Sequence, residues 1–185
     1  MCIATLGDAI KAQTLIVNGV SKAYAMTGWR IGYTAGPRAV IAAMAAYQSH
    51  ATSNPNSIAQ QAALAAYQGD QSCTSAMCAA FASRRNLMVR RINEIKGLSC
   101  ATPKGAFYVM LNVQNLIGRS YHGTCITSAF DFAQLLLQEQ HVAVIPGESF
   151  GADGFCRLSY AIGEDRINEA MDRLTAFVCA VRAAA

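Results

Sequence analysis

In the first part of the chain, short apolar runs alternate with segments in which apolar residues recur at the spacing of a helix. The run Leu15–Val20 is rich in β-branched residues and bounded by glycine, which predicts a buried strand. A second strand is predicted over Arg30–Thr34. Pro37 suits the first position of a helix, because its missing N–H has no intrahelical partner there. Asn54 and Pro55 predict the cap and the first residue of another helix.

The pattern changes after residue 70. The longest helical period runs from Gln71 to Lys96 and stops at Gly97, a residue typical of helix ends. Beyond it, strands are predicted over 106–113, 142–145 and 155–162, with one helix beginning at the capping box Ser128–Asp131. The last helix turns one apolar stripe inward: Ile167, Met171, Leu174, Val178 and Val181. These elements predict an α/β chain in three parts: a partial α/β layer (1–70), a linking helix (71–97) and a small α+β domain (98–185).

Composition narrows the class of protein. Hydrophobic residues make up 53% of the chain and charged residues 14%, which excludes an intrinsically disordered chain. No apolar stretch approaches the roughly 20 residues of a membrane-spanning helix, so we expect no membrane partner. The net charge of +4 is too small to predict a nucleic-acid interface. Seven irregularly spaced cysteines and the lack of a signal peptide predict a cytoplasmic protein with reduced thiols and no metal site.

The segment with the most distinctive chemistry follows the first predicted strand. Lys22 comes directly after this strand, and Arg30 follows between Gly28 and Gly32. A lysine amine forms a Schiff base with an aldehyde when partial burial or a nearby cation keeps it unprotonated. A guanidinium grips a phosphate with parallel hydrogen bonds. The pair suits pyridoxal phosphate, which carries both an aldehyde and a phosphate. The residue types alone also allow a second interpretation, in which a lysine at the end of a strand and an arginine on the surface bind no ligand.

The order of residues in this segment is more specific than their types. The pattern Ser21-Lys22-x5-Gly28-x-Arg30-x-Gly32 closely resembles the cofactor-attachment signature of class I/II pyridoxal-phosphate-dependent aminotransferases, which have fold type I. The flanking residues are most similar to the bacterial aspartate aminotransferase subgroup. Later segments resemble further motifs of this family in the expected order: residues 52–60, 103–108, 144–151 and 157–161. The resemblance implies the C-terminal portion of that fold, with 1–70 as a remnant of its large domain.

The resemblance also implies roles for particular residues. Lys22 would attach the cofactor as a Schiff base and then carry a proton. Ser21, beside the lysine, would also bind the cofactor, and Arg30 would bind its phosphate. Asn54 and Ser53 would line the site of a neighbouring subunit. The implied reaction moves an amino group between an amino acid, aspartate or a similar one, and a 2-oxo acid.

Arg157 would bind the α-carboxylate of the substrate in this family, and its strand supports the role independently. Side chains alternate between the two faces of a strand, so an apolar face is predicted for Cys156, Leu158, Tyr160 and Ile162. Arg157 points to the opposite face, where a guanidinium needs an anionic partner. A structural ion pair is the alternative interpretation of the same arginine.

The family's remaining cofactor residues lie upstream of its lysine, and here only Asp8 is acidic before Lys22. We therefore expect a C-terminal portion of an aminotransferase that has very low or no activity by itself and exposes apolar surface in residues 14–68. A homodimer or the missing N-terminal half would cover this surface. Two alternatives stay open: a non-catalytic module for folding or subunit interaction, and a pyridoxal phosphate lyase on the same fold.

Overall fold

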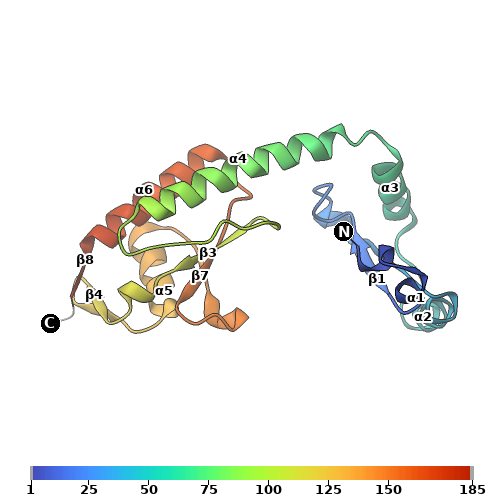
Figure 1. The fold of residues 1–185 in the computed structure, drawn as a ribbon, viewed down its shortest axis with the longest axis horizontal. Coiled ribbons are helices and arrows are strands. Elements are labelled where there is room, and N and C mark those ends of the chain that lie inside the picture. Colours follow the sequence, from blue (N-terminus) through green and yellow to red (C-terminus); the bar gives the residue numbers. More distant parts are fainter. Residues whose placement is uncertain (1, 184–185) are drawn as a thin grey trace. The chain divides into compact units, whose positions relative to one another are not determined.

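The computed structural model describes residues 2–183, which form mixed α/β structure as predicted (Figure 1). The chain divides into two compact units, residues 1–76 (unit 1) and residues 77–185 (unit 2). The boundary falls within the long helix α4, Ser72–Glu94, close to the helix predicted over 71–96. Within residues 2–183, no helix combines the length and hydropathy needed to cross a bilayer.

Unit 1 is built on a two-stranded antiparallel hairpin. Strands β1 and β2 pair from Ile16 opposite Ala35 to Gly19 opposite Gly32. A Cβ atom on Gly19 would lie 3.1 Å from the Cα atom of Gly32, so the two strands approach closely where both residues are glycine. The elements of unit 1 before α4 are η1 (Ile3–Thr5), α1 (Asp8–Lys11), β1 (Ile16–Gly19), η2 (Thr27–Trp29), β2 (Gly32–Ala35), α2 (Arg38–Ala51) and α3 (Ser57–Gln68).

The start of α3 differs from the prediction. Asn56, and not Asn54, is the N-cap, and its side-chain oxygen accepts a hydrogen bond from the Ala59 N–H at 3.1 Å. The Asn54 amide instead donates to the Pro55 carbonyl oxygen at 2.9 Å, within the turn before the helix. Both asparagines are chemically suited to capping, so residue type alone does not select between them.

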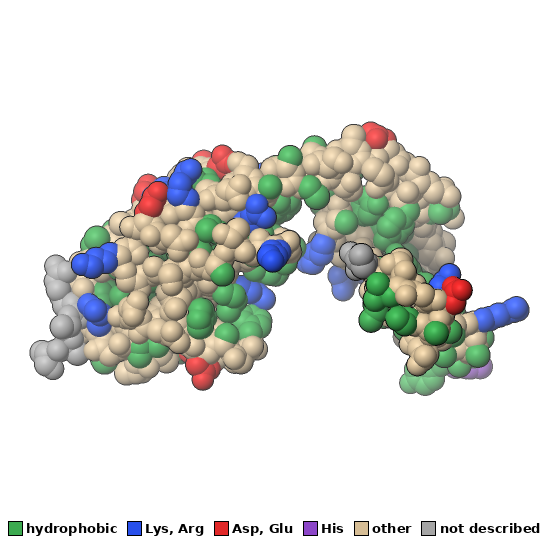
Figure 2. Space-filling view, viewed as in Figure 1, with side chains coloured by type: hydrophobic (Ala, Val, Ile, Leu, Met, Phe, Trp, Pro, Cys, Tyr) green, Lys and Arg blue, Asp and Glu red, His purple; other side chains and the backbone are tan. Residues whose placement is uncertain are grey.

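Most large apolar side chains of unit 1 are exposed. The prediction of a fully buried first strand is wrong, because Val17 is 79% exposed. Among the described residues of unit 1, only Val20 and Ala59 are buried hydrophobic residues. Figure 2 shows apolar side chains at the surface of this unit. The exposed set is Ile3, Leu6, Ile10, Leu15, Val17, Trp29, Tyr33, Val40, Met44, Tyr47, Ile58, Leu64 and Tyr67, which confirms the expected exposure of residues 14–68.

Unit 2 combines two three-stranded sheets with helices. One sheet has the order β3-β7-β6 and the other β5-β4-β8, with all pairs antiparallel. Its strands are β3 (Tyr108–Asn112), β4 (Arg119–Tyr121), β5 (Thr124–Ile126), β6 (Ile145–Pro146), β7 (Phe155–Ser159) and β8 (Val181–Ala183). Its helices, apart from α4, are η3 (Gln114–Leu116), α5 (Ala129–Gln140), η4 (Gly147–Phe150) and α6 (Glu164–Ala180).

The hydrophobic core of unit 2 lies between these helices and strands. Ile167, Met171 and Leu174 of α6 are fully buried, as the stripe predicts. Phe177 continues the stripe one turn later and stacks on Tyr121, with ring centroids 4.4 Å apart. It also meets Phe132 of α5 edge-on at 5.5 Å. The final predicted member of the stripe, Val181, belongs to β8 instead.

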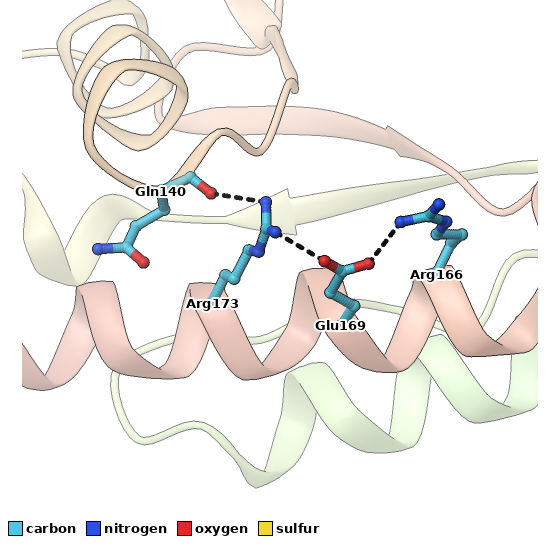
Figure 3. A network of polar contacts seen from close by, with 4 residues as sticks. All are labelled: Gln140, Arg166, Glu169 and Arg173. Carbon is cyan, nitrogen blue, oxygen red and sulfur yellow. Dashed lines mark hydrogen bonds and ion pairs between the residues drawn. The ribbon is translucent and has the colours of Figure 1, made fainter.

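Polar contacts join the helices of unit 2 at their surfaces. Figure 3 shows Glu169 between two arginines of α6: it accepts from Arg166 at 2.8 Å and from Arg173 at 2.6 Å. Arg173 also donates to the Gln140 carbonyl oxygen at 3.2 Å, which satisfies an acceptor at the end of α5. Along α4, Arg91 pairs with Asp172 of α6 at 2.6 Å. The Arg173 and Arg91 contacts therefore link α6 to α5 and to α4, whereas the two ion pairs of Glu169 lie within α6.

Two side chains satisfy backbone N–H groups at the start of α5. Ser128 caps the helix as predicted, its hydroxyl oxygen accepting from the Asp131 N–H at 3.1 Å. The Glu148 carboxylate accepts from the Ala129 N–H at 3.1 Å. An anion at this position also interacts favourably with the helix dipole. Glu148 therefore ties the turn before β7 to the N-terminus of α5.

Candidate active site

Lys22 and Ser21 lie in a loop, residues 20–31, that joins β1 to β2. Val20, 1% exposed, anchors the start of this loop, and its carbonyl accepts from the Tyr24 N–H at 3.2 Å. Ser21 is half-buried and Lys22 is exposed. The partial burial considered for Lys22 from the sequence is therefore not observed.

Arg30 ends the short helix η2 in the same loop. Its backbone is left-handed, with φ 51° and ψ 45°, and its Nη1 donates to the Thr27 carbonyl at 2.9 Å. A non-glycine residue in this region costs about 1–2 kcal/mol, and such strain concentrates at functional positions. The hydrogen bond folds the arginine side chain back over η2 and leaves its other N–H groups for further acceptors.

A hollow of about 670 Å³ lies beside Arg30. The loop contributes Ala25, Gly28, Trp29 and Arg30 to its lining, and the start of α3 contributes Asn56, Ile58 and Ala59. Lys22 is not among the described residues that line it. Lys22 and Arg30 thus belong to one loop of 12 residues, 20–31, and of the two only Arg30 lines the hollow.

The donor set of this loop fits pyridoxal phosphate in its chemistry. An exposed primary amine can condense with an aldehyde, and an exposed guanidinium can bind a phosphate. Gly28 has no heavy atom within 4 Å of the position a Cβ would take, so the backbone there is open to a ligand. Within the described part of the chain, no group of three or more His, Cys, Asp or Glu side chains could hold a metal ion.

Three tyrosines pack together beside this loop. Tyr67 of α3 meets Tyr24 and Tyr33 edge-on, with ring centroids 5.4 and 5.8 Å apart. Desolvation, together with the hydrogen bond to Tyr33, raises the pKa of Tyr67 to about 12. The Tyr24 hydroxyl lies 2.8 Å from the Gln71 Oε1 and donates to it. Through Tyr24, this cluster holds the loop against α3.

Ser53 and Asn54 lie in the connection between α2 and α3, and both are exposed. Ser53, like Arg30, was predicted as a site residue and has a left-handed backbone, at φ 64°. Neither residue lines the hollow beside Arg30 in the described structure. Their side chains therefore belong to the surface of unit 1.

Arg157 belongs to unit 2 and is considered within that unit. It is half-buried on β7, between Met110 of β3 and Ile145 of β6 in the strand register. The alternation predicted for this strand is confirmed at Cys156 and Leu158, which are 0% and 5% exposed. It is wrong at Ile162, which is 41% exposed, because β7 ends at Ser159. Burial, with the nearby negative charge of Glu148 as a smaller cause, raises the pKa of Cys156 to about 12, so this thiol stays neutral.

Two rings lie against the Arg157 guanidinium. Its Cζ atom is 4.4 Å from the Tyr108 ring centroid and 4.4 Å from that of Phe150. Both residues stand in segments that the sequence analysis singled out, 103–108 and 144–151, but neither was predicted as a site residue. Sequence reasoning missed these two contacts because they depend on which strands pair with β7.

Comparison with known proteins gives a consistent result. The family model for aminotransferase class I and II matches residues 2–174. The aspartate aminotransferase of Rhizobium meliloti is 48% identical over 174 residues, which cover 94% of this chain and 42% of the relative. The aspartate/prephenate aminotransferase of Cereibacter sphaeroides is 50% identical over 175 residues, covering 94% and 44%.

Solved structures agree with the sequence relatives. The crystal structure of the Rhizobium meliloti aspartate aminotransferase superposes with a TM-score of 0.92 at 46% identity, over 97% of this chain and 45% of that one. The aromatic aminotransferase from Pyrococcus horikoshii gives a TM-score of 0.82 at 34% identity, over 92% and 44%. The chain thus spans less than half the length of these relatives. By sequence and by fold, it belongs to the aminotransferase class I and II family.

Proposed function

We propose that this chain takes part in transfer of an amino group between an amino acid, aspartate or a similar one, and a 2-oxo acid, with pyridoxal phosphate as cofactor. The observation that carries the proposal is the loop 20–31, which presents the Lys22 amine and the Arg30 guanidinium in a chain that matches the aminotransferase family over residues 2–174. Relatives named for aspartate support aspartate as the donor.

Three residues of the loop have roles in this proposal. The Lys22 amine would hold the cofactor and carry a proton to and from the substrate carbon. Arg30 would hold the phosphate by charge-assisted hydrogen bonds, with Ser21 beside the lysine. When bound, the pyridoxal ring supplies an electron sink for the charge that develops on the substrate carbon.

Arg157 would bind the α-carboxylate of the substrate. Among the described residues, no hydrogen bond or ion pair joins its guanidinium to another side chain, whereas Arg91, Arg166 and Arg173 are each paired with a carboxylate. A half-buried cation without an ion pair is well placed to accept an anionic ligand. This sets Arg157 apart from those three paired arginines and argues against the ion-pair alternative.

The proposal includes contact with further polypeptide. The described residues of unit 1 include thirteen exposed large apolar side chains, and extensive exposed apolar surface is typical of interfaces. A homodimer partner, or the N-terminal half of a longer protein, would cover it. Exposed Ser53 and Asn54 would then face the site of a neighbouring subunit.

An isotope assay tests the proposed reaction. The chain is incubated with pyridoxal phosphate, ¹⁵N-aspartate and 2-oxoglutarate, and ¹⁵N-glutamate is measured by mass spectrometry. We expect slow formation of labelled glutamate that a Lys22→Ala variant abolishes, because the amine has no substitute in the loop.

Other products would favour the alternatives. Cofactor attachment without labelled glutamate would support a non-catalytic module. Release of carbon dioxide or ammonia without glutamate would support a lyase on the same fold. An Arg84→Ala variant, altered at a helix surface of unit 2, serves as the matched control and should leave the product unchanged.

A further inference from the structure

The two rings beside Arg157 reach it from segments on either side of its strand. The sheet order is β3-β7-β6, so β7 is the central strand. Tyr108 is the first residue of β3, and Phe150 ends η4, which follows β6. Both ring centroids lie 4.4 Å from the Arg157 Cζ, well inside the limit of about 6 Å for a cation–π interaction.

This arrangement stabilises a cation without using its hydrogen-bond donors. An aromatic ring attracts a guanidinium through the negative potential of its face, and an arginine side chain can stack with its flat side on such a ring. The N–H groups of arginine lie in the guanidinium plane and remain available at its edge. No described side chain forms an ion pair with Arg157, so no protein anion competes for that edge.

We propose that Tyr108 and Phe150 are positioning residues, which hold the Arg157 guanidinium by its faces and leave its edge for a planar carboxylate. The assignment of a carboxylate ligand rests on the function proposed above. The added claim is that the rings set the orientation of the arginine before the ligand arrives.

Orientation matters because arginine has many rotamers. Fixing the side chain in advance removes most of the entropy that carboxylate binding would otherwise lose. Loss of one ring would free the guanidinium and weaken the attraction that holds it. From the strength of partly exposed cation–π contacts, we expect carboxylate binding to weaken about threefold to tenfold for each ring removed.

Side-chain NMR of the full chain tests this without cofactor. Arginine Nε–Hε signals are recorded on ¹⁵N-labelled protein, and the Arg157 signal is assigned by its loss in an Arg157→Lys variant. Relaxation then reports the order of the side chain, and titration with succinate at constant ionic strength reports carboxylate binding. Phe150→Leu and Tyr108→Leu remove a ring, while Phe150→Tyr and Tyr108→Phe keep it as matched controls.

The expected result is a rigid Arg157 in the wild type and in both variants that keep the ring. Each leucine variant should show a mobile Arg157 and succinate binding three- to tenfold weaker. An equally rigid Arg157 and unchanged binding in the leucine variants would overturn the proposal. Tyr108 belongs to a strand, so the Tyr108→Leu variant can fail to fold. Phe150 is 47% exposed and tolerates truncation better, so Phe150→Leu then provides the test by itself.

The design separates this claim from the proposed function. Succinate binding that survives the Arg157→Lys change would overturn the carboxylate role of Arg157. In that case the relaxation data still decide whether the rings hold the guanidinium. A Tyr108→Phe variant that behaves like Tyr108→Leu would assign the effect to the hydroxyl group and so overturn the role of the ring.

Discussion

A Lys22→Arg variant is expected to lose all pyridoxal phosphate that borohydride fixes at this position in the wild-type chain. Arginine keeps the positive charge and most of the length of lysine, but its guanidinium stays protonated and does not condense with an aldehyde. The chain is incubated with the cofactor, reduced, digested and mapped by mass spectrometry. We expect the mass increase on the peptide that contains Lys22 and none there in the variant.

The other lysines of the chain provide the control for this experiment. Lys11, Lys96 and Lys104 are exposed, as Lys22 is, and they measure non-specific reaction with the aldehyde. A Lys104→Arg variant should leave the label on Lys22 unchanged. Equal labelling of all these lysines in the wild type would contradict a specific role for Lys22.

A Phe177→Ala variant is expected to lower the free energy of unfolding of unit 2 by about 3–5 kcal/mol. The Phe177 side chain is fully buried and contacts the rings of Tyr121 and Phe132, so its removal leaves a cavity lined by aromatic groups. Urea denaturation followed by circular dichroism measures the change. A loss of this size is a large fraction of the stability of a typical domain.

Phe130→Ala is the matched control for the core variant. Phe130 is on α5 and 59% exposed, so the same truncation there should change stability by only about 0.5 kcal/mol. Equal losses from both variants would show that the core of unit 2 is not packed around Phe177.

The pattern of apolar residues within a single helix or strand predicted which of its side chains are buried. The alternation at Cys156 and Leu158 and the inward positions Ile167, Met171 and Leu174 of α6 were predicted correctly, because the period of a strand or helix decides which side chains point inward. The three-residue strands β4, β5 and β8 were missed, since so short a segment has no period to detect. The cap of α3 was placed two residues early, because Asn54 and Asn56 carry the same capping signal.

Features that join distant segments could not be predicted in this way. The sequence identified Lys22 and Arg30, but not the antiparallel pairing of β1 and β2 that closes their loop. It identified Arg157, but the rings of Tyr108 and Phe150 reach that arginine only through the order of three strands. Likewise, the contact of Glu148 with α5 links residues that are 19 positions apart.

The central claim is that Lys22 and Arg30 act on one ligand, an aldehyde that carries a phosphate. The most direct measurement compares the labelling of Lys22 by pyridoxal phosphate with its labelling by pyridoxal, which lacks the phosphate, in the wild type and in Arg30→Gln. We predict that the wild type favours the phosphorylated aldehyde by about tenfold, as expected for one charge-assisted contact, and that Arg30→Gln removes the preference. Equal labelling by the two aldehydes in the wild type, or a preference that survives the loss of Arg30, would contradict the claim.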